Sequence, residues 1–327
     1  METQQVDLEC QPTSPTLTTA SAPFNKSTDL VLRSSDMVDF HVWTVMLKEA
    51  SPMFDAMLSI PQPVADPEHD VPVVHVTEDS KTLRGILELC YPMAPSIIQE
   101  KNIDVVLHII EAALKYSMEW PVALVEQSLK ELAGDQPLRV YAIAQRHRMP
   151  ELAQFAAHAS LRYSFPGEYC PELEDITGGA YYRLVKYHEN CARAVGAVMQ
   201  ETAWMGRRNQ YTWFSCQNVK CGPPPNGRYI LEGYIPKAWF AVWMDGVLAD
   251  LRKRPCKETA STTNIETVSM NLGCPNCKAK AHIDLTKFRV LLAEEVEKQL
   301  AKASTRFLNY FVAYAHQVFD QIELEFR

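Results

Sequence analysis

The sequence predicts an α+β protein with helices around a small sheet in the first third of the chain. A mostly helical region follows, then a small cysteine-rich segment and a long C-terminal helix. Three observations predict this class. Apolar residues alternate between positions 29 and 42, as in half-buried strands, and they recur every three or four positions over much of the remainder. Four of the nine cysteines form two close pairs, Cys216/Cys221 and Cys274/Cys277.

Length and composition restrict the class of protein. A chain of 327 residues with 47% hydrophobic residues is long enough for two or more domains with real cores. No apolar run approaches the ~18 residues of a membrane span, and the first residues lack the basic-then-apolar pattern of a signal peptide. We therefore expect no membrane segment and a cytoplasmic or nuclear location. In such a compartment the cysteines would be thiols or metal ligands instead of disulfides.

The first elements follow from composition and period. Residues 1–24 are rich in Thr, Ser, Gln and Pro and show no period, which predicts a disordered tail. Residues 29–32 and 38–42 alternate, which predicts a hairpin that turns at 33–36. Residues 43–58 have apolar side chains at helical spacing, so we expect one helix there.

Later elements are predicted in the same way. Four prolines between Ile60 and Pro72 exclude regular structure in that loop. A short strand is expected at 73–76, and Ser80 is a candidate cap for a helix that begins near Lys81. Helical spacing predicts further helices over residues 103–114, 121–132, 138–144, 152–159, 180–204 and 285–326.

Several blocks in the first 120 residues resemble one known family. Phe40-x-Val42…Leu47-x3-Ser51-Pro52-x-Phe54 resembles the core signature of the BTB/POZ family. Blocks at 73–76, 83–91 and 112–118 resemble its next strand and helices, in the family's order, and the likeness covers about ninety residues. The family often has His where this chain has Trp43. The chain resembles fungal members more than animal ones.

The resemblance implies a compact interaction domain that commonly forms homodimers through its first helix and N-terminal segment. Carried onto this chain, that surface comprises Val42, Trp43, Met46, Met53, Phe54 and Met57. The expected organisation is a disordered tail (1–24), a BTB/POZ domain (25–132), a helical extension (133–205), a cysteine-pair segment (206–284) and a long C-terminal helix (285–327).

The two cysteine pairs predict a metal site. Zinc is held by four ligands in a tetrahedron, and two close pairs separated by a long insert are a usual way to supply them. Cys216, Cys221, Cys274 and Cys277 are therefore the candidate ligands of a structural zinc ion. His282, separated from Cys277 by four residues, could replace one ligand, and Cys256 or the pair His188/Cys191 are weaker substitutes. The same residues are also compatible with four free thiols, or with a redox Cys-x-x-Cys that lacks a thioredoxin-like context.

Charge and motifs bound the function. Residues 201–290 carry 13 Lys and Arg against 7 Asp and Glu, a net charge of +6, while the rest of the chain carries −14. This basic segment, with a cluster at Arg252-Lys253-Arg254 and Lys257, fits either an anionic partner or a solvated surface. No Gly-rich phosphate loop, Gly-x-Ser-x-Gly elbow or His-Glu-x-x-His motif occurs, so we expect no enzyme.

The leading prediction is a non-catalytic protein–protein interaction module that dimerises and acts as an adaptor or scaffold. One alternative is a substrate adaptor of a cullin-type ubiquitin ligase, which would dock through the core helices and the helical pair at 138–161. The family's hydrophobic-x-Glu docking motif is, however, not evident between Leu58 and Val73. The other alternative is a nucleic-acid-associated regulator that uses the basic cysteine segment.

Overall fold

The computed structural model describes residues 16–60, 71–219, 221–224, 231 and 233–325, and it gives only the backbone for Ile98, Trp120, Pro121, Arg208 and 305–325. Three predictions lie outside what it describes: the tail before residue 16, most of the proline-rich loop, and the side-chain stripe of the last helix beyond residue 304. The chain divides into two compact units, Met1–Leu132 and Ala133–Arg327. They are called the N-terminal and the C-terminal unit.

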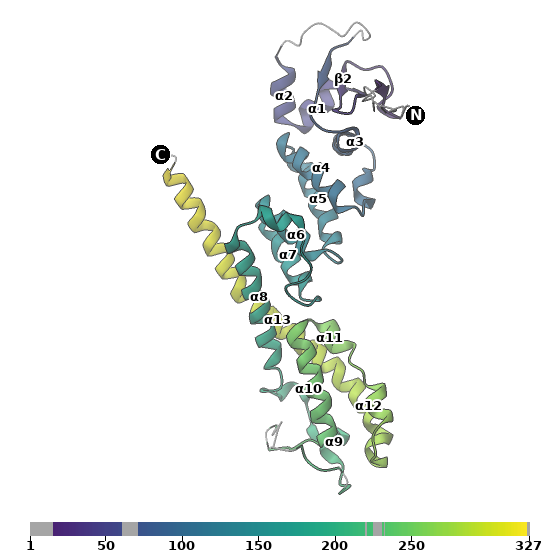
Figure 1. The fold of residues 1–327 in the computed structure, drawn as a ribbon, viewed down its shortest axis with the longest axis vertical. Helices are drawn as coiled ribbons and strands as arrows, with labels where there is room; N and C mark the ends of the chain where they lie inside the picture. The colour runs from purple at the N-terminus through teal and green to yellow at the C-terminus, as the bar shows by residue number, and fades with distance from the viewer. Residues whose placement is uncertain (1–15, 61–70, 220, 225–230, 232, 326–327) are drawn as a thin grey trace, which may run out of the picture. The chain divides into compact units, whose positions relative to one another are not determined.

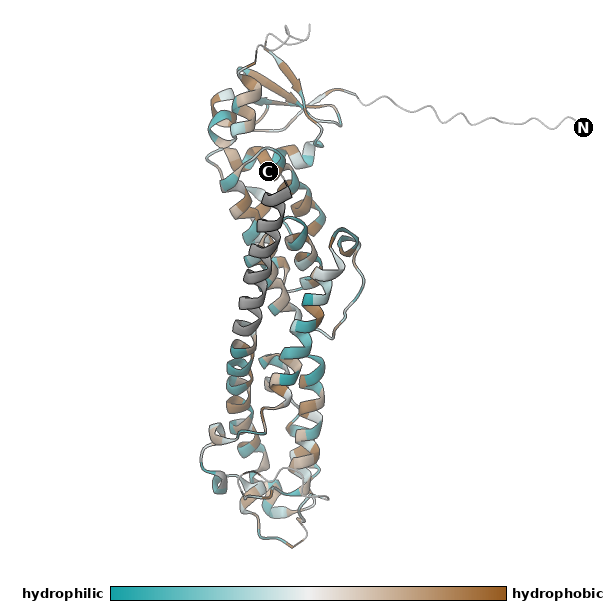
Figure 2. Ribbon diagram, turned by 90° about the vertical axis from the view of Figure 1, so that its left-hand side faces the viewer, coloured by the Kyte–Doolittle hydropathy of each residue, from teal (hydrophilic) through white to brown (hydrophobic). Residues whose placement is uncertain are grey.

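A four-stranded sheet lies in the N-terminal unit (Figure 1). Its strands are β1 (Thr18–Thr19), β2 (Leu30–Arg33), β3 (Val38–Val42) and β4 (Val73–His75). The strand order is β1-β3-β2-β4, in which β2 and β3 are antiparallel and the two outer strands run parallel to their neighbours. The predicted hairpin is thus confirmed, with Leu32 opposite Phe40. All four residues of β2 are buried, and the strands are mostly brown, that is hydrophobic, in Figure 2.

The segment before the hairpin differs from the prediction. Residues 16–24 were assigned to a disordered tail, but Thr18 and Thr19 pair with β3. Phe24 is 1% exposed and lies against Phe40 and Tyr91, with ring centroids 5.9 Å and 5.3 Å away. Edge pairing uses backbone groups and needs no apolar period, so composition alone could not reveal it.

Helices complete the N-terminal unit: α1 (Thr44–Ala50), α2 (Pro52–Leu58), α3 (Ser80–Cys90), the 3₁₀ turn η1 (Ser96–Gln99), α4 (Ile103–Lys115) and α5 (Glu119–Leu132). The single helix predicted over 43–58 is two helices. Pro52 disfavours the helical conformation at the preceding residue, and Ser51 is extended, with φ −149° and ψ 115°. Its hydroxyl accepts the Phe54 N–H and donates to the Tyr116 carbonyl, which joins α2 to the end of α4.

Two further contacts hold this unit together. The cap of α3 is Asp79, not Ser80, because the Asp79 carboxylate accepts the Thr82 N–H. In the same helix Gly85 faces Ile109 of α4 so closely that an added Cβ would lie 2.4 Å from the Ile109 Cδ1 atom. A larger residue at this position would therefore force the Ile109 side chain to move.

The C-terminal unit is helical. Its elements are α6 (Pro137–Arg146), α7 (Pro150–Ser160), η2 (Pro171–Asp175), α8 (Gly178–Gly196), η3 (Ala203–Met205), η4 (Arg208–Gln210), α9 (Thr212–Ser215), α10 (Ala238–Lys253), α11 (Lys257–Ser261), α12 (Glu266–Met270) and α13 (Pro275–Glu325). Helices α6 and α7 pack against each other, and α13 packs against α8, α9, α11 and α12. Figure 2 shows hydrophobic and hydrophilic residues alternating along these helices, as in amphipathic helices.

Two helix boundaries correct the sequence predictions. The helix expected over 180–204 ends at Gly196, after which the Ala197 N–H bonds back to the Arg193 carbonyl. The last helix begins at Pro275 instead of residue 285. Proline is favoured in the first turn of a helix, so residues 275–284 form the start of this helix.

Candidate metal centre

The structure brings together the four cysteines that the sequence singled out. Cys216 follows α9, Cys221 lies five residues later, Cys274 directly precedes α13, and Cys277 lies in the first turn of that helix. All four sulfur atoms lie within 4.8 Å of one another. Cys216, Cys274 and Cys277 are buried, and Cys221 is partly exposed.

The distances between the sulfur atoms suit one tetrahedral ion. The Sγ atoms of Cys216 and Cys274 are 3.8 Å apart, and those of Cys221 and Cys277 are 3.6 Å apart. Four sulfurs placed about 2.3 Å from a zinc ion would be separated by about 3.8 Å along each tetrahedral edge. The observed pairs match this edge and are too long for disulfide bonds, whose length is about 2.05 Å. Four thiolates fill a tetrahedron and leave no open position for a substrate.

The start of α13 provides an environment for a thiolate. The backbone N–H groups of Cys277 and Asn276 donate to the Cys274 sulfur and lower the pKa of this thiol to about 7. The first N–H groups of a helix have no partners within it, and the helix dipole favours negative charge there. Local folding of the Cys-Pro-Asn-Cys sequence therefore favours the thiolate form of Cys274.

The sulfur atoms of Cys221 and Cys277 are less readily ionised in the protein alone. Burial raises the pKa of the Cys277 thiol to about 11, and burial also raises the pKa of Cys221. Thiols must lose their protons to bind a metal ion. Binding at this centre would therefore release protons and would be favoured by higher pH.

Two backbone hydrogen bonds hold the segment that follows Cys216 beside the four cysteines. The Cys221 N–H bonds to the Asn218 carbonyl at 2.9 Å, which closes a tight turn between the first two ligands. The Ala238 N–H then bonds to the Gly222 carbonyl at 3.0 Å, which holds the start of α10 beside this turn. Backbone hydrogen bonds thus hold the segment that carries the first pair of candidate ligands.

An aromatic cluster adjoins the cysteines. Trp213 of α9 is fully buried and stacks on Tyr211 and on Phe240 of α10, with ring centroids 4.6 Å and 4.4 Å away. Its edge contacts Phe288 of α13 at 5.5 Å. Asp284, also on α13, accepts the Thr212 N–H at 2.8 Å and so caps α9. Three kinds of contact, namely sulfur, aromatic and capping, therefore connect α9 with the first turns of α13.

The substitute ligands proposed from the sequence lie elsewhere. Among the described residues, the potential metal-ligating group at this centre consists of the four cysteines. His282 is exposed on α13, and the Cys256 sulfur is paired with the Thr259 hydroxyl at 3.2 Å. His188 is bonded to the Ser160 hydroxyl at 2.8 Å. None of these side chains is therefore positioned as a fifth or replacement ligand.

Sequence reasoning missed two residues that shape the centre. Trp239, at the second position of α10, packs directly against the cysteine cluster. Asp284 caps α9 across 72 positions of sequence. The abundance of tryptophan between the cysteine pairs was the signal for the first residue, whereas no local pattern marks an aspartate that acts over such a distance.

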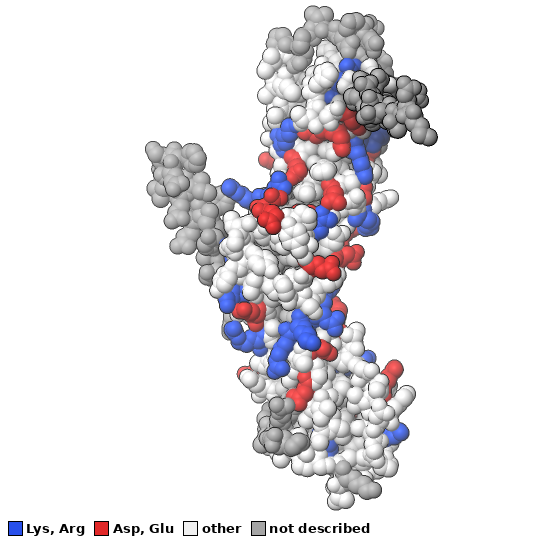
Figure 3. All heavy atoms as spheres, in the orientation of Figure 1, with Lys and Arg blue, Asp and Glu red and all other residues white. Residues whose placement is uncertain are grey.

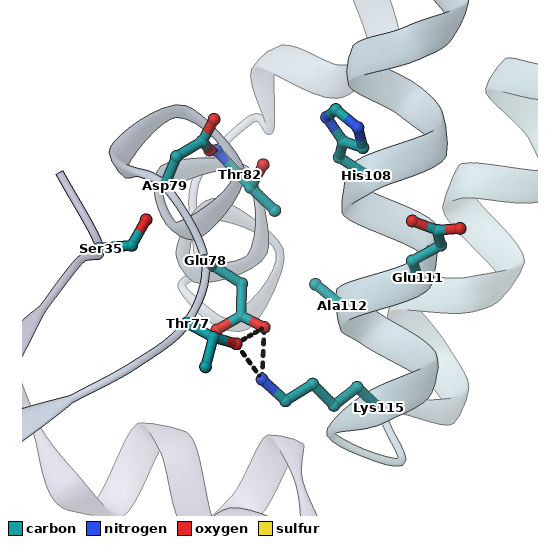
Figure 4. Close-up of a pocket in the computed structure, with 9 residues that line it drawn as sticks. All are labelled: Ser35, Thr77, Glu78, Asp79, Thr82, His108, Glu111, Ala112 and Lys115. Atoms are coloured by element: carbon teal, nitrogen blue, oxygen red, sulfur yellow. Dashed lines mark hydrogen bonds and ion pairs between the residues drawn. The ribbon is translucent and has the colours of Figure 1, made fainter.

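A second hollow lies in the N-terminal unit, between the start of α3 and one side of α4 (Figure 4). It has a volume of about 370 Å³. Lys115 donates to the Glu78 carboxylate at 2.7 Å and to the Thr77 hydroxyl at 2.6 Å, and Tyr116 donates to Glu78 at 2.6 Å. Burial raises the pKa of Glu78, but these hydrogen bonds outweigh it and lower the pKa below its usual value. The charged Glu78 carboxylate is therefore used in an ion pair with Lys115 within the unit.

Basic side chains gather at the end of α10. Figure 3 shows Lys and Arg atoms together on the face where α8 and α10 lie. Arg252 and Arg193 line a surface hollow of about 770 Å³ with small residues of α8 between them. Lys257, which the sequence grouped with this cluster, is instead paired with Glu297 at 2.8 Å. The cluster is thus smaller than the sequence suggested.

Comparison with known families identifies the N-terminal unit. Residues 21–132 match the model of the BTB/POZ domain family. This range contains most of the sheet and α1 to α5, so a BTB/POZ domain followed by a mostly helical region is the fold class of the chain. The match covers about a third of the sequence and does not extend to the cysteine centre. No curated protein gives a significant match. In the described part of the chain, no helix combines the length and apolarity that crossing a membrane requires.

Proposed function

We propose that this protein is a non-catalytic adaptor or scaffold that pairs with a second copy of itself through its BTB/POZ domain. The observation that carries this proposal is the apolar outer surface of α1 and its flanks. Trp43, Val45 and Met53 are 49%, 58% and 43% exposed, although each is a large apolar side chain. Exposed apolar side chains that form one patch are typical of protein–protein interfaces. These three residues belong to neighbouring elements, namely α1, the residue before it, and α2, and dimerisation through this helix is what the family likeness implies.

The surface is narrower than the sequence resemblance suggested. Val42 and Phe54 were among the expected interface residues, but both are fully buried, and the Phe54 ring stacks on Tyr116 at 4.4 Å. These two residues belong to the core and are not available to a partner. The surface that we assign to the second copy therefore comprises Trp43, Val45 and Met53, with Met46 and Met57 partly exposed beside them.

Light scattering on the full chain tests the homodimer. We expect a dimer at micromolar concentration and a monomer for the double variant Trp43→Asp/Met53→Asp, because each new carboxylate would have to be desolvated in the interface. The matched control is Val242→Asp, which places the same charge at an apolar position of α10 that is 73% exposed. A wild-type chain that is strictly monomeric would refute self-association.

We also infer that Cys216, Cys221, Cys274 and Cys277 hold one structural zinc ion. The support is the all-cysteine ligand set, the tetrahedral spacing of the sulfur atoms and the lack of a free coordination position. When bound, zinc would supply four bonds that tie the segment after α9 to the first turn of α13. The proposed role is to stabilise the C-terminal unit.

Elemental analysis of protein purified without chelators tests this centre. We expect one zinc ion per chain in the wild type and loss of that zinc in Cys274→Ser. The matched control is Cys256→Ser, because Cys256 is also buried in the C-terminal unit but pairs with Thr259, and a serine can keep that hydrogen bond. A wild type without stoichiometric metal would remove the site.

Two narrower roles are alternatives within this proposal. The helical pair α6–α7 follows the BTB/POZ domain directly and supports docking to a cullin scaffold. The cluster Arg252-Lys253-Arg254 supports a nucleic-acid partner, although Lys220 and Arg228 lie outside the described residues. A pull-down with a cullin N-terminal domain and a salt-dependent nucleic-acid binding assay separate the two roles.

We also propose that the protein acts in the cytoplasm or nucleus, and that its relatives are fungal members of the family.

A further inference from the structure

Trp239 occupies a special position beside the cysteine centre. It lies in the first turn of α10, packs against the cysteine cluster, and meets the Trp213 ring edge-on at 6.0 Å. Its indole nitrogen is buried, yet among the described residues it makes no standard hydrogen bond. Burying an N–H donor without an acceptor costs about 1–3 kcal/mol, so a buried donor in this position needs an explanation.

The sulfur of Cys277 is the acceptor that this donor can reach. The indole N–H lies within reach of the Cys277 sulfur, and Trp239 packs against the buried cluster that contains this cysteine. A hydrogen bond to sulfur is longer than one to oxygen because the sulfur atom is larger, so a contact of this kind falls outside the geometry of an N–H···O bond. Neutral sulfur is a weak acceptor, whereas bonds to an ionised acceptor are stronger.

The negative charge of a metal-bound centre would be stabilised by the indole N–H of Trp239. Four thiolates around one divalent cation carry a net charge of −2, which has to be stabilised by surrounding dipoles. Cys274 receives two backbone N–H groups at the helix start. Cys277 is 0% exposed, so water cannot solvate its sulfur, and the buried indole N–H of Trp239 is a donor placed beside it.

We propose that the indole N–H of Trp239 donates a hydrogen bond to the metal-bound thiolate of Cys277, and that Trp239 is a positioning residue that raises the metal affinity of the centre. This inference rests on the proposed zinc site. Groups that hydrogen-bond to metal ligands typically change metal affinity by 10- to 100-fold. The aromatic body of Trp239 meanwhile fills space beside Trp213, so the residue contributes to both the core and the centre.

The test uses the full chain, reduced and loaded with Co²⁺, and compares Trp239→Phe with Trp243→Phe. Phenylalanine keeps an aromatic ring and removes the N–H. Trp243 is the matched control because it lies one turn along the same helix and contacts Phe240 and Phe288 of the same aromatic cluster. Competition with a chromophoric chelator gives the affinity, and the sulfur-to-cobalt charge-transfer band reports the electronic state of the thiolates.

We expect Trp239→Phe to weaken Co²⁺ binding about tenfold and to shift the charge-transfer band to longer wavelength, because a thiolate that loses a donor holds its electrons less tightly. Trp243→Phe should leave both readouts unchanged. A purely structural role for Trp239 would not move the band of the metal that remains bound. If the wild type binds Co²⁺ and Trp239→Phe changes neither readout, this inference is overturned while the metal centre stands. If the wild type binds no Co²⁺, both fail.

A second measurement needs no variant to fold. In wild-type protein labelled with ¹⁵N, the indole proton of Trp239 should shift when Cd²⁺ is added and should exchange slowly with solvent. The indole proton of Trp204, whose nitrogen donates to the Val198 carbonyl at 3.1 Å, should not shift. A Trp239 signal that does not respond to bound Cd²⁺ would overturn the proposed hydrogen bond.

Discussion

In the N-terminal unit the fully buried side chains are mostly aliphatic and lie on a sheet and the helices packed around it. In the C-terminal unit aromatic rings from α9, α10 and α13 surround Trp213, and the four cysteines adjoin them. The charges differ as well. The N-terminal unit has 8 Lys and Arg against 20 Asp and Glu, a net charge of −12, whereas the C-terminal unit has 24 against 20, a net charge of +4.

The comparison shows two ways to organise a core. Strand β2 lies between β3 and β4, and its hairpin partner is close in sequence, so short-range signals define much of that unit. The C-terminal unit instead depends on contacts between residues far apart, such as Asp284 with Thr212 and Cys277 with Cys221. A metal ion would connect such distant segments directly, because its binding is coupled to the folding of the segments that supply its ligands.

The largest expected effect is a loss of stability that is confined to one of the two units. Trp213→Ala should destabilise the C-terminal unit by about 4 kcal/mol, because it removes a fully buried indole from the centre of the aromatic cluster. Thermal unfolding followed by near-UV circular dichroism and calorimetry should show one transition lowered and the other unchanged. Phe54→Ala is the matched variant in the other unit and should lower the opposite transition. Equal shifts of both transitions would contradict two independent cores.

The next largest effect is a loss of stability of the C-terminal unit at acidic pH. Burial lowers the pKa of His188 to about 4 from 6.5, so the folded unit holds this imidazole neutral while the unfolded chain protonates it. Stability is therefore complete above pH 6.5 and falls as the pH drops towards 4, by about 3 kcal/mol in total. Urea titrations of the wild type between pH 7 and pH 4 measure this loss. In His188→Gln the dependence on pH should become much shallower.

The N-terminal unit should respond at lower pH. For Asp36, burial raises the pKa, but hydrogen bonds from Ser34 and Ser80 outweigh it and lower the pKa below 3.8. Glu78 is likewise lowered below 4.5. A lowered carboxyl pKa gives stability that is present above the unfolded-state value and is lost as the pH falls through the folded one. Between pH 6.5 and 4.5 the same titrations should thus weaken the C-terminal unit alone.

A smaller effect tests the break between α1 and α2. Ser51→Ala should destabilise the N-terminal unit by about 1–2 kcal/mol, because it removes the cap of α2 and the hydrogen bond to the Tyr116 carbonyl. Chemical denaturation of the full chain measures the change. Ser51→Thr keeps a hydroxyl and should recover part of the loss. An unchanged transition in Ser51→Ala would show that the hydroxyl is not needed to join α2 to α4.

The smallest effect is expected on the surface of the C-terminal unit. Lys257→Ala removes an exposed ion pair with Glu297, and exposed pairs of this kind contribute little to stability. We expect no shift in the unfolding transition beyond measurement error. A clear loss of stability would show that this ion pair contributes to holding α11 on α13.

The sequence was informative where the cause of structure is local. Alternation predicted the β2–β3 hairpin, and helical spacing predicted much of the remainder. The break at Ser51-Pro52 could have been predicted, because proline restricts the residue before it. The short strand β1 could not, since backbone pairing leaves no mark on Thr18 and Thr19.

The same distinction applies to the candidate site. The cysteines were predicted to meet because their chemistry and spacing are unusual, and the structure places their sulfur atoms together. Trp239 could be predicted only as one of several tryptophans, because its role depends on where α10 begins relative to Cys277. The identity of the metal ion depends on solution chemistry as well as on the ligand set and stays a proposal.

The position of Cys277 on α13 has a mechanical consequence. It lies on the same buried stripe of the helix as Ala281, Leu285, Phe288, Leu292, Val296 and Leu300. Successive residues of a helix are rotated by about 100°, so anchoring one sulfur near the first turn also fixes the rotational phase of the stripe that follows. Inserting a single residue after Cys277 would turn that stripe by more than a quarter of a circle, away from the helices it packs against.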